Sequence, residues 1–407
     1  MGQRSIHGLP PDPPTVARVL HGLPGFAWLD SSDGSDRWGG DLLAACPRSV
    51  EHGRLPAAWP EDPPEGTVRI GSIDYEGDWT FGLYDRWLRF DRASSSWSGS
   101  PGLAAEFRRA WKARRHGNSE IPPPPVVGAL RTEMTEADFI ERVRAAREFI
   151  AAGDIYQVNL SQRFLLDWPP AADAFAAYRR LRVLSPVPHA AFLDQGRRVV
   201  LCASPESFLV REGDRLLTRP IKGTRPRRAD RREDEMMHSD LLDSAKERAE
   251  LIMITDLGRN DLGRVARTGS VRVSSLCQVE SFAQVHHLVS EIEAVLRPGL
   301  GWSEVMRACF PGGSITGAPK KRACEIIAGL EPGARRLFTG AIGWLGPSGR
   351  GVFNIAIRTA WIEDEQAVFA AGSGIVADSD PHAEYLETLH KARALSLALG
   401  GPDLVES

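Results

Sequence analysis

The chain has 407 residues, 42% of them hydrophobic, and its 50 basic and 53 acidic side chains leave a formal net charge of -3. This balance excludes a strong general attraction to nucleic acid or to an anionic membrane, so an anionic ligand has to be held by a local site. The sequence shows no apolar run long enough to cross a membrane and no apolar signal core near its start, so we expect a cytoplasmic protein.

The cysteines do not suggest a metal site or a disulfide framework. They are odd in number, widely spaced and without a CxxC pair, which favours reduced, structural thiols. They are Cys46, Cys202, Cys277, Cys309 and Cys324.

A proline-rich segment, "EIPPPPVVGAL" at 120–130, divides the chain. We predict an N-terminal lobe over residues 1–125 and a second, catalytic lobe over 126–407. The first lobe contains strand-like runs such as "TVRIGSIDY" and "WTFGLYDRWLRF" and little recognisable chemistry. The second begins with a helix capped by Thr135 and ended by Gly153, and then the strand "YQVNLSQRFLL".

A first β-hairpin is predicted over 197–223, where polar and apolar residues alternate on both sides of the turn at Gly213. With the turn there, paired residue numbers sum to about 426, so Glu206 faces Pro220 or a neighbour. Lys222 follows two residues later, within several ångströms of Glu206 at about 3.3 Å per residue. From geometry alone the pair is either a salt bridge at the rim of the sheet or a pair of reactive groups.

A second β-hairpin is predicted over 351–380 with its turn near Asp364, so that paired numbers sum to about 728. Arg358 then lies opposite the region of Ala370, beside "GSG" at 372–374. Arginine can hold a carboxylate with two hydrogen bonds, and glycines allow a ligand to approach the backbone. The segment is therefore a candidate anion site, although a structural ion pair and a bulge would give the same pattern.

The segment "CFPGGSITGAPKKRACEII" leads from glycines into a helix with Pro319 near its first position. Free N–H groups at Thr316, Gly317 and Ala318 would favour an anion there. A nucleotide phosphate loop is disfavoured because Ala-Pro stands where that motif needs Lys-Ser or Lys-Thr.

Two further helices carry carboxylates. The first is predicted over about 239–257, with Asp243, Glu247 and Glu250 along one side, and the second follows "DPH" at 380–382 and pairs Glu387 with Lys391. Both patterns also suit exposed ion pairs. If the helices flank one cleft, Glu250 and Glu387 could supply the one or two carboxylates that usually hold Mg²⁺.

Taken together, eight stretches resemble the chorismate-utilising enzymes, a family that includes the large subunits of anthranilate synthase and aminodeoxychorismate synthase as well as isochorismate and salicylate synthases. They occur in the family's order and cover about 135–395. The stretches are "YQVNLSQRF", "SPESFL", "PIKGTRPR", "KERAELIMITDLGRNDLGRVA", "VHHLVSEIEA", "PGGSITGAPKKRACEII", "NIAIRTA" and "AGSGIVADSDPHAEYLETLHKA". The resemblance implies an α+β fold of large antiparallel β-sheets flanked by helices, with the active site between them.

By motif, the resemblance implies that Glu250 and Glu387 bind Mg²⁺, which holds a carboxylate of chorismate, and that Glu206 is the general acid for the departing C4 hydroxyl. Hydroxide leaves poorly without a proton, and a dicarboxylate needs cationic partners. The substrate-binding set implied by the resemblance is Gly223, Thr224, His287, Thr316, Gly317, Ala318, Arg358, Gly372, Ser373, Gly374 and Lys391.

Two positions separate the branches of the family. By the resemblance, isochorismate and salicylate synthases carry a water-activating lysine at the position where this chain has Gln157, so addition of water is disfavoured. Anthranilate synthases typically read Pro-Ile-Ala-Gly-Thr where this chain reads Pro-Ile-Lys-Gly-Thr. Lys222 is typical of the aminodeoxychorismate synthase branch. There the unprotonated lysine is thought to attack C2 of chorismate as the C4 hydroxyl leaves, before ammonia enters at C4 and expels the lysine.

The resemblance also bears on partners. The chain shows no glutaminase triad, so ammonia is expected from a separate glutaminase subunit or from solution, with 4-aminobenzoate or folate synthesis as the expected pathway. Relatives have a tryptophan pocket in the first lobe, of which residues 1–125 would hold a remnant at most. Phe338 and Gly258 depart from the usual family residues. Anthranilate synthase component I and a non-catalytic carboxylate-binding protein remain as alternatives.

Overall fold

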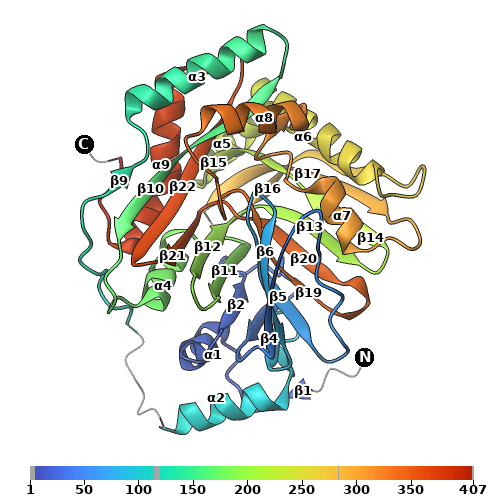
Figure 1. The fold of residues 1–407 in the computed structure, drawn as a ribbon, viewed down its shortest axis with the longest axis vertical. Helices are drawn as coiled ribbons and strands as arrows, with labels where there is room; N and C mark the ends of the chain where they lie inside the picture. The colour runs from blue at the N-terminus through green and yellow to red at the C-terminus, as the bar shows by residue number, and fades with distance from the viewer. Residues whose placement is uncertain (1–4, 114–119, 283, 406–407) are drawn as a thin grey trace.

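Two large antiparallel β-sheets form the body of the protein, and helices cover them (Figure 1). This computed structural model describes residues 5–113, 120–282 and 284–405. The expected α+β fold class is confirmed. The helices are α1 (Pro13–Leu20), α2 (Pro101–Ala113), α3 (Glu136–Ala151), α4 (Ala174–Leu184), α5 (Arg231–Asp243), α6 (Ala245–Gly263), α7 (Trp302–Cys309), α8 (Lys320–Leu330) and α9 (Pro381–Leu399), with a 3₁₀ turn at Pro347–Gly349.

The first sheet has 12 strands and the second has 10. In spatial order the first contains β1 (Ser5–Ile6), β8 (Ser96–Gly99), β7 (Trp87–Asp91), β3 (Asp41–Ala44), β2 (Ala27–Asp30), β11 (His189–Asp194), β12 (Val199–Ser204), β21 (Thr359–Glu363), β22 (Gln366–Ile375), β10 (Gln157–Asp167) and β18 (Gly317–Ala318), with β9 (Arg131–Thr132) beside β10. The second contains β15 (Ile221–Pro226), β17 (Val285–Val295), β14 (Arg215–Arg219), β13 (Ser207–Glu212), β20 (Gly351–Ile355), β19 (Ala341–Leu345), β5 (Val68–Ile73), β6 (Asp78–Tyr84) and β4 (Ser49–Arg54), with β16 (Arg272–Ser281) beside β17.

Alternating side chains divide the core into layers. Along β2, Ala27 and Leu29 join a cluster that contains residues of both sheets, whereas Trp28 between them joins the cluster that includes residues of α1, α2, α4 and α9. Successive residues of a strand point to opposite faces, so one strand serves both layers. The second sheet buries its other face against α7 and part of α6.

The N-terminal strands belong to both sheets. β1, β2, β3, β7 and β8 pair within the first sheet, and β4, β5 and β6 within the second. The division of the chain at residue 125 therefore remains a prediction about sequence organisation. The segment from 121 to 130 has no regular secondary structure, as its prolines indicate.

Local signals predicted both ends of α3 correctly. Thr135 caps α3 in a reciprocal capping box with Asp138, and Gly153 follows with φ of 81°. The helix predicted over 239–257 is wrong as one element, because the chain forms α5 and α6 with a break at Ser244. Ser244 has an extended conformation, and its side chain accepts a hydrogen bond from the Glu247 amide, which starts a new helix.

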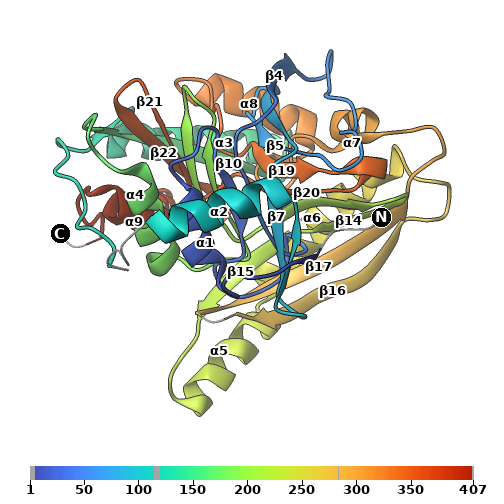
Figure 2. The ribbon, with the colours of Figure 1, turned by 90° about the horizontal axis from the view of Figure 1, so that it is seen from below.

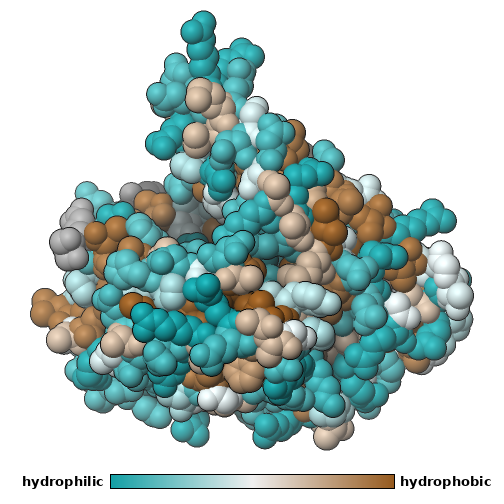
Figure 3. All heavy atoms as spheres, turned by 90° about the horizontal axis from the view of Figure 1, so that it is seen from above, coloured by the Kyte–Doolittle hydropathy of each residue, from teal (hydrophilic) through white to brown (hydrophobic). Residues whose placement is uncertain are grey.

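Helix α5 projects from the body, beside the end of β15 and β16 (Figure 2). On the face seen from above, hydrophilic side chains dominate and brown areas are scattered among them (Figure 3). In the described part of the chain, no helix combines the length and the apolarity that a membrane crossing needs.

Candidate active site

The first hairpin brings Glu206 and Lys222 to the same end of the second sheet. Ser207 pairs with Arg219, as predicted, and a bulge shifts the remaining pairs by one residue. Lys222 lies in β15 opposite Leu288 of β17. Its ion-pair partner among the described residues is Glu250, with 3.9 Å between Nζ and Oε2, so of the two interpretations the rim salt bridge between Lys222 and Glu206 is wrong. The reason is that α6 presents a carboxylate to Lys222 from outside the hairpin.

Glu206 is 5% exposed, and its carboxyl group is easily protonated. Burial raises the pKa of Glu206 to about 7, although a hydrogen bond from Ser314 and the charge of Lys222 act to lower it. A carboxylic acid with a pKa near 7 can give up a proton at neutral pH. The environment thus suits the general acid that the sequence predicts.

Lys222 lies over a glycine of the first sheet. A Cβ atom on Gly374 would be 3.6 Å from Lys222 Nζ and 2.5 Å from Gln157 Nε2. Gly374 belongs to β22 and pairs with Asn159 of β10. Residues from the two sheets therefore meet at this point, and the absence of a side chain on Gly374 lets the Gln157 amide and the Lys222 amine approach the β22 backbone.

The residues after Lys222 make a bulge toward β17. Gly223 has φ of 66°, and a Cβ atom there would be 2.7 Å from the side chain of Leu241. The hydroxyl of Thr224 lies 3.0 Å from Nδ1 of His287. Burial lowers the pKa of His287 to about 4, so its imidazole is neutral at pH 7.

The two predicted metal-ligating carboxylates lie among lysines. Glu387 pairs with Lys391 at 2.5 Å, and burial raises the pKa of Glu250 although Lys222 acts to lower it. Burial acts to raise the pKa of Glu387 as well, but Lys391 and Lys222 bring it below the ordinary value. Both carboxylates thus interact with Lys222, one from α6 and one from α9. Their oxygen donors fit Mg²⁺, which needs only one or two carboxylates beside water and substrate.

Arg358 is half-buried and interacts electrostatically with Glu387. It precedes β21, has φ of 50°, and its carbonyl accepts a hydrogen bond from Ala203. Among the described residues, no carboxylate lies within ion-pair distance of Arg358. Burial lowers the pKa of Arg358, although the charge of Glu387 acts to raise it. A half-buried guanidinium without a close carboxylate can pair with the carboxylate of a ligand.

Strand β22 contains the "GSG" residues 372–374 close to its end at Ile375. The second hairpin pairs Glu363 with Gln366, one residue away from the predicted register. Gly372 accepts a hydrogen bond at its carbonyl from Lys391 Nζ, at 2.9 Å. The Ser373 hydroxyl is buried and lacks a hydrogen-bond partner among the described residues. The Gly372 carbonyl and the Ser373 hydroxyl therefore lie close to the cationic side chain of Lys391, which in turn interacts with the charge of Arg358.

The segment Thr316 to Ala318 precedes a helix whose start lies next to Pro319, as predicted. Gly317 and Ala318 form the short strand β18 against β10, and α8 starts at Lys320. The expectation of a free N–H at Thr316 is wrong because that group donates to the carbonyl of Gly313, at 3.3 Å. The segment still lies beside Gln157 of β10. A Cβ atom on Gly317 would be 2.1 Å from the carbonyl oxygen of Gln157, so only glycine fits there.

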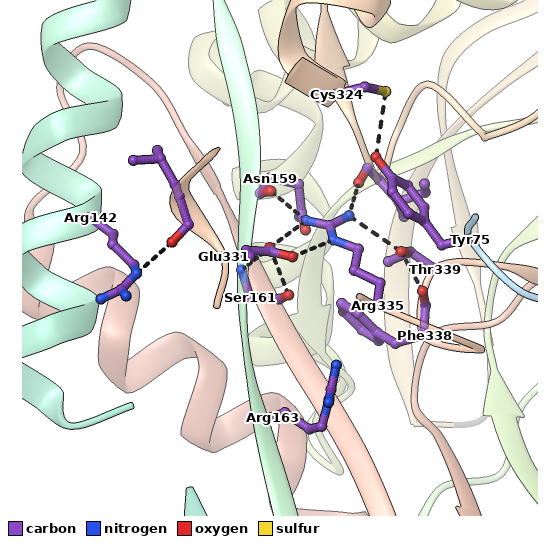
Figure 4. Close-up of polar contacts among 12 residues, drawn as sticks. Tyr75, Arg142, Asn159, Ser161, Arg163, Cys324, Glu331, Arg335, Phe338 and Thr339 are labelled. Atoms are coloured by element: carbon purple, nitrogen blue, oxygen red, sulfur yellow. Dashed lines mark hydrogen bonds and ion pairs between the residues drawn. The ribbon is translucent and has the colours of Figure 1, made fainter. Parts of the chain in front are cut away.

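Sequence reasoning missed a buried ion pair beneath these strands. Arg335 is 3% exposed and pairs with Glu331 (Figure 4). The signal in the sequence is the spacing of Glu331 and Arg335 by four residues after the glycine-rich segment. That spacing is common on protein surfaces, so it did not indicate burial.

Comparison with known proteins identifies the family. The family model described as chorismate binding enzyme matches residues 68–396. Anthranilate synthase component 1 of Streptomyces coelicolor is 48% identical over 267 residues, which cover 65% of this chain and 52% of that protein. Aminodeoxychorismate synthase component 1 of Bacillus subtilis is 42% identical over 276 residues, covering 68% of this chain and 58% of that protein. The matched region thus spans roughly half to two thirds of these relatives.

Solved structures give the same fold. Anthranilate synthase component I from Streptococcus pneumoniae has a TM-score of 0.74 and 29% identity, over 87% of this chain and 91% of that chain. The menaquinone-specific isochorismate synthase of Escherichia coli has a TM-score of 0.76 over 95% of this chain and 91% of that chain, and at 18% identity it supports the fold alone. The chain therefore belongs to the chorismate binding enzyme family.

Proposed function

We propose that this protein converts chorismate and ammonia to 4-amino-4-deoxychorismate, as the large subunit of an aminodeoxychorismate synthase. The observation that carries the proposal is the position of Lys222. Its amine lies between the carboxylate of Glu250 and the backbone of Gly374, on the same sheet end as the buried acid Glu206. A nucleophile and an acid at one site are what displacement of a hydroxyl group requires.

The proposed chemistry has two displacements. The unprotonated amine of Lys222 forms a bond to C2 of chorismate while the C4–O bond breaks, and Glu206 gives its proton to the leaving hydroxide, which departs as water. Ammonia then bonds to C4 as the C2–N bond to Lys222 breaks, and Glu206 takes back a proton from the incoming ammonia nitrogen. The sum is replacement of the C4 hydroxyl by an amino group, with release of one water.

Binding of the dicarboxylate would rest on the cationic and backbone groups around this point. Arg358 would pair with one carboxylate through its guanidinium, and Lys391 lies beside Glu387 and the Gly372 carbonyl. We propose that Glu250 and Glu387 hold Mg²⁺. The ion would supply charge stabilisation to a substrate carboxylate and would offset the negative charge of the two ligands.

The remaining predicted substrate contacts stay part of this proposal. Gly223 and Thr224 lie on the bulge beside neutral His287, and Thr316, Gly317, Ala318, Ser373 and Gly374 lie on β18, β22 and the turn that precedes β18. We expect a separate glutaminase subunit to supply ammonia, a cytoplasmic location, and a role in 4-aminobenzoate or folate synthesis.

Formation of anthranilate is the second candidate. It is favoured by the 48% identity to anthranilate synthase component 1 of Streptomyces coelicolor. It is disfavoured by Lys222, because release of pyruvate to form anthranilate has no need of a second amine at C2. The two reactions give products that are easily separated.

Product analysis tests the proposal. Purified protein is incubated with chorismate, a magnesium salt and an ammonium salt, and products are separated by liquid chromatography with mass and fluorescence detection. We expect 4-amino-4-deoxychorismate from the wild type and none from Lys222→Ala, while Lys321→Ala, which changes an exposed lysine, retains activity. Fluorescent anthranilate as the main product would refute the proposal.

A further inference from the structure

Arg335 uses its complete hydrogen-bonding capacity inside the protein. Nε and one terminal nitrogen donate to the two oxygens of Glu331, at 2.8 and 2.7 Å. The other donors reach the carbonyl of Ile315 at 2.9 Å, the carbonyl of Asn159 at 2.7 Å and the hydroxyl of Thr339 at 3.3 Å. A guanidinium has five N–H donors in a fixed plane, so every donor has a partner (Figure 4).

The acceptors belong to the segments that carry the proposed substrate contacts. Ile315 directly precedes Thr316, and Asn159 of β10 pairs with Gly374. Oε1 of Glu331 also accepts from the amide and the hydroxyl of Ser161, at 2.9 and 2.8 Å. Ser161 is the partner of Gly372 in the sheet. One ion pair therefore connects the turn before β18 to β10, and β10 is hydrogen-bonded to β22.

The pair is itself held firmly. The guanidinium lies 4.9 Å from the ring centre of Tyr75 and 5.7 Å from that of Phe338. The amide of Arg335 donates to Glu76 at 2.8 Å, so the turn between β5 and β6 supports it from the N-terminal part of the chain. The side chains of Arg335 and Glu331 are only 2% and 6% exposed. Such a buried pair cannot lose one member without leaving unpaired polar groups.

We propose that Arg335 and Glu331 form a positioning pair that sets the distance between the Thr316 to Ala318 segment and the β10–β22 strands, and thereby the affinity of the site for chorismate. This proposal rests on the proposed binding of chorismate at these strands, and it does not depend on which product is formed. Neither side chain touches the substrate in this account. The pair acts through the carbonyls of Ile315 and Asn159 and through Ser161.

Two conservative substitutions test the pair. Arg335→Lys keeps the charge but offers three donors from one nitrogen, which cannot reach carbonyls and a carboxylate in different directions. Glu331→Gln replaces an oxygen by an NH₂ group, which has to face either the Ser161 donors or the Arg335 donors. The matched control is Arg182→Lys, which removes a bidentate pair with Asp30 over the Trp28 ring, in α4 and β2.

Binding and turnover are measured separately on folded protein. Titration calorimetry with chorismate and a magnesium salt, without ammonia, gives Kd, and steady-state assays with ammonium give KM and kcat. We expect roughly 10- to 100-fold weaker binding in Arg335→Lys and Glu331→Gln, with KM raised more than kcat is lowered, because small displacements of positioned groups cost this much. Peptide-level hydrogen exchange should speed up over 157–162 and 312–318.

The control separates positioning from loss of stability. Arg182→Lys should lower the melting temperature while its chorismate Kd stays within about twofold of wild type. The proposal is overturned if Arg335→Lys and Glu331→Gln bind chorismate as tightly as the control, or if their exchange rises equally over the whole chain. If wild type itself fails to bind chorismate in the same titration, the proposed function fails instead.

Discussion

Replacement of Glu206 by glutamine should stabilise the protein at high pH and abolish its activity. Burial raises the pKa of Glu206 to about 7 from an ordinary 4.5. The native state therefore keeps a proton that the unfolded chain releases above pH 4.5, so the stability from this group is complete below that pH and falls as pH rises to about 7. At 1.36 kcal/mol per pH unit the loss amounts to about 3 kcal/mol.

Glutamine is neutral at every pH, so Glu206→Gln has no such loss. The free energy of unfolding of the variant and the wild type should agree within about 1 kcal/mol near pH 4.5 and should differ by about 3 kcal/mol above pH 8, with the variant more stable. Urea unfolding of both proteins at several pH values, without substrate or magnesium, measures the difference. The amide cannot give a proton to hydroxide, so product formation should stop. A variant that is no more stable at pH 8, or one that still forms product, would refute the reasoning.

Three further predictions concern the same site. Gly374→Ala should reduce turnover at least tenfold, because the new Cβ would lie 2.5 Å from the buried Gln157 amide. The control Gly329→Ala should be active in the same assay, because a Cβ there meets nothing within 4 Å. Glu250→Gln should raise the magnesium concentration needed for half-maximal activity at least tenfold. The control is Glu325→Gln, which changes an exposed residue. If Glu250→Gln needs no more magnesium than the wild type, Glu250 is not part of the metal site. The imidazole of His287, whose pKa burial lowers to about 4, should stay neutral between about pH 8 and pH 5 by NMR, and protonation near pH 6.5 would contradict its buried placement.

The two hairpins were predictable because strand alternation and turn residues are local signals. The pair of Ser207 and Arg219 was predicted in its register, and the second turn falls at Asp364 and Glu365, which both have positive φ. The structure differs from the prediction by a bulge in the first hairpin and by a one-residue shift of register in the second. Period-two patterns define faces well, but they do not show where an extra residue enters a strand.

The errors came from contacts between distant segments. The ion pair of Lys222 with Glu250 joins a strand to a helix that starts two dozen residues later, and no spacing rule predicts such an approach. The break at Ser244 interrupts a run of good helix formers, although Ser244 and Glu247 have the S-x-x-E spacing that is typical of a helix start. Arg335 looks like a surface residue in the sequence because its burial depends on carbonyls supplied by β10 and by the turn before β18.

The motifs nevertheless identified most of the groups that now lie near one another. Glu206, Lys222, Glu250, Glu387 and Lys391 come from four different elements or loops, and electrostatic interactions of Lys222 connect it to Glu206, Glu250 and Glu387. The sequence provides residue types and their order, whereas the approach of the two sheets determines which of them interact. Their catalytic and binding roles stay proposals.

Trapping of a covalent adduct on Lys222 tests the central claim most directly. Wild-type protein is mixed with chorismate and a magnesium salt in the absence of ammonia, denatured rapidly, digested and mapped by mass spectrometry. The account predicts a chorismate-derived group, less one water, on the peptide that contains Lys222, and its disappearance when ammonium is added before denaturation. Formation of 4-amino-4-deoxychorismate by protein in which Lys222 never carries this group, or by Lys222→Ala, would contradict the account.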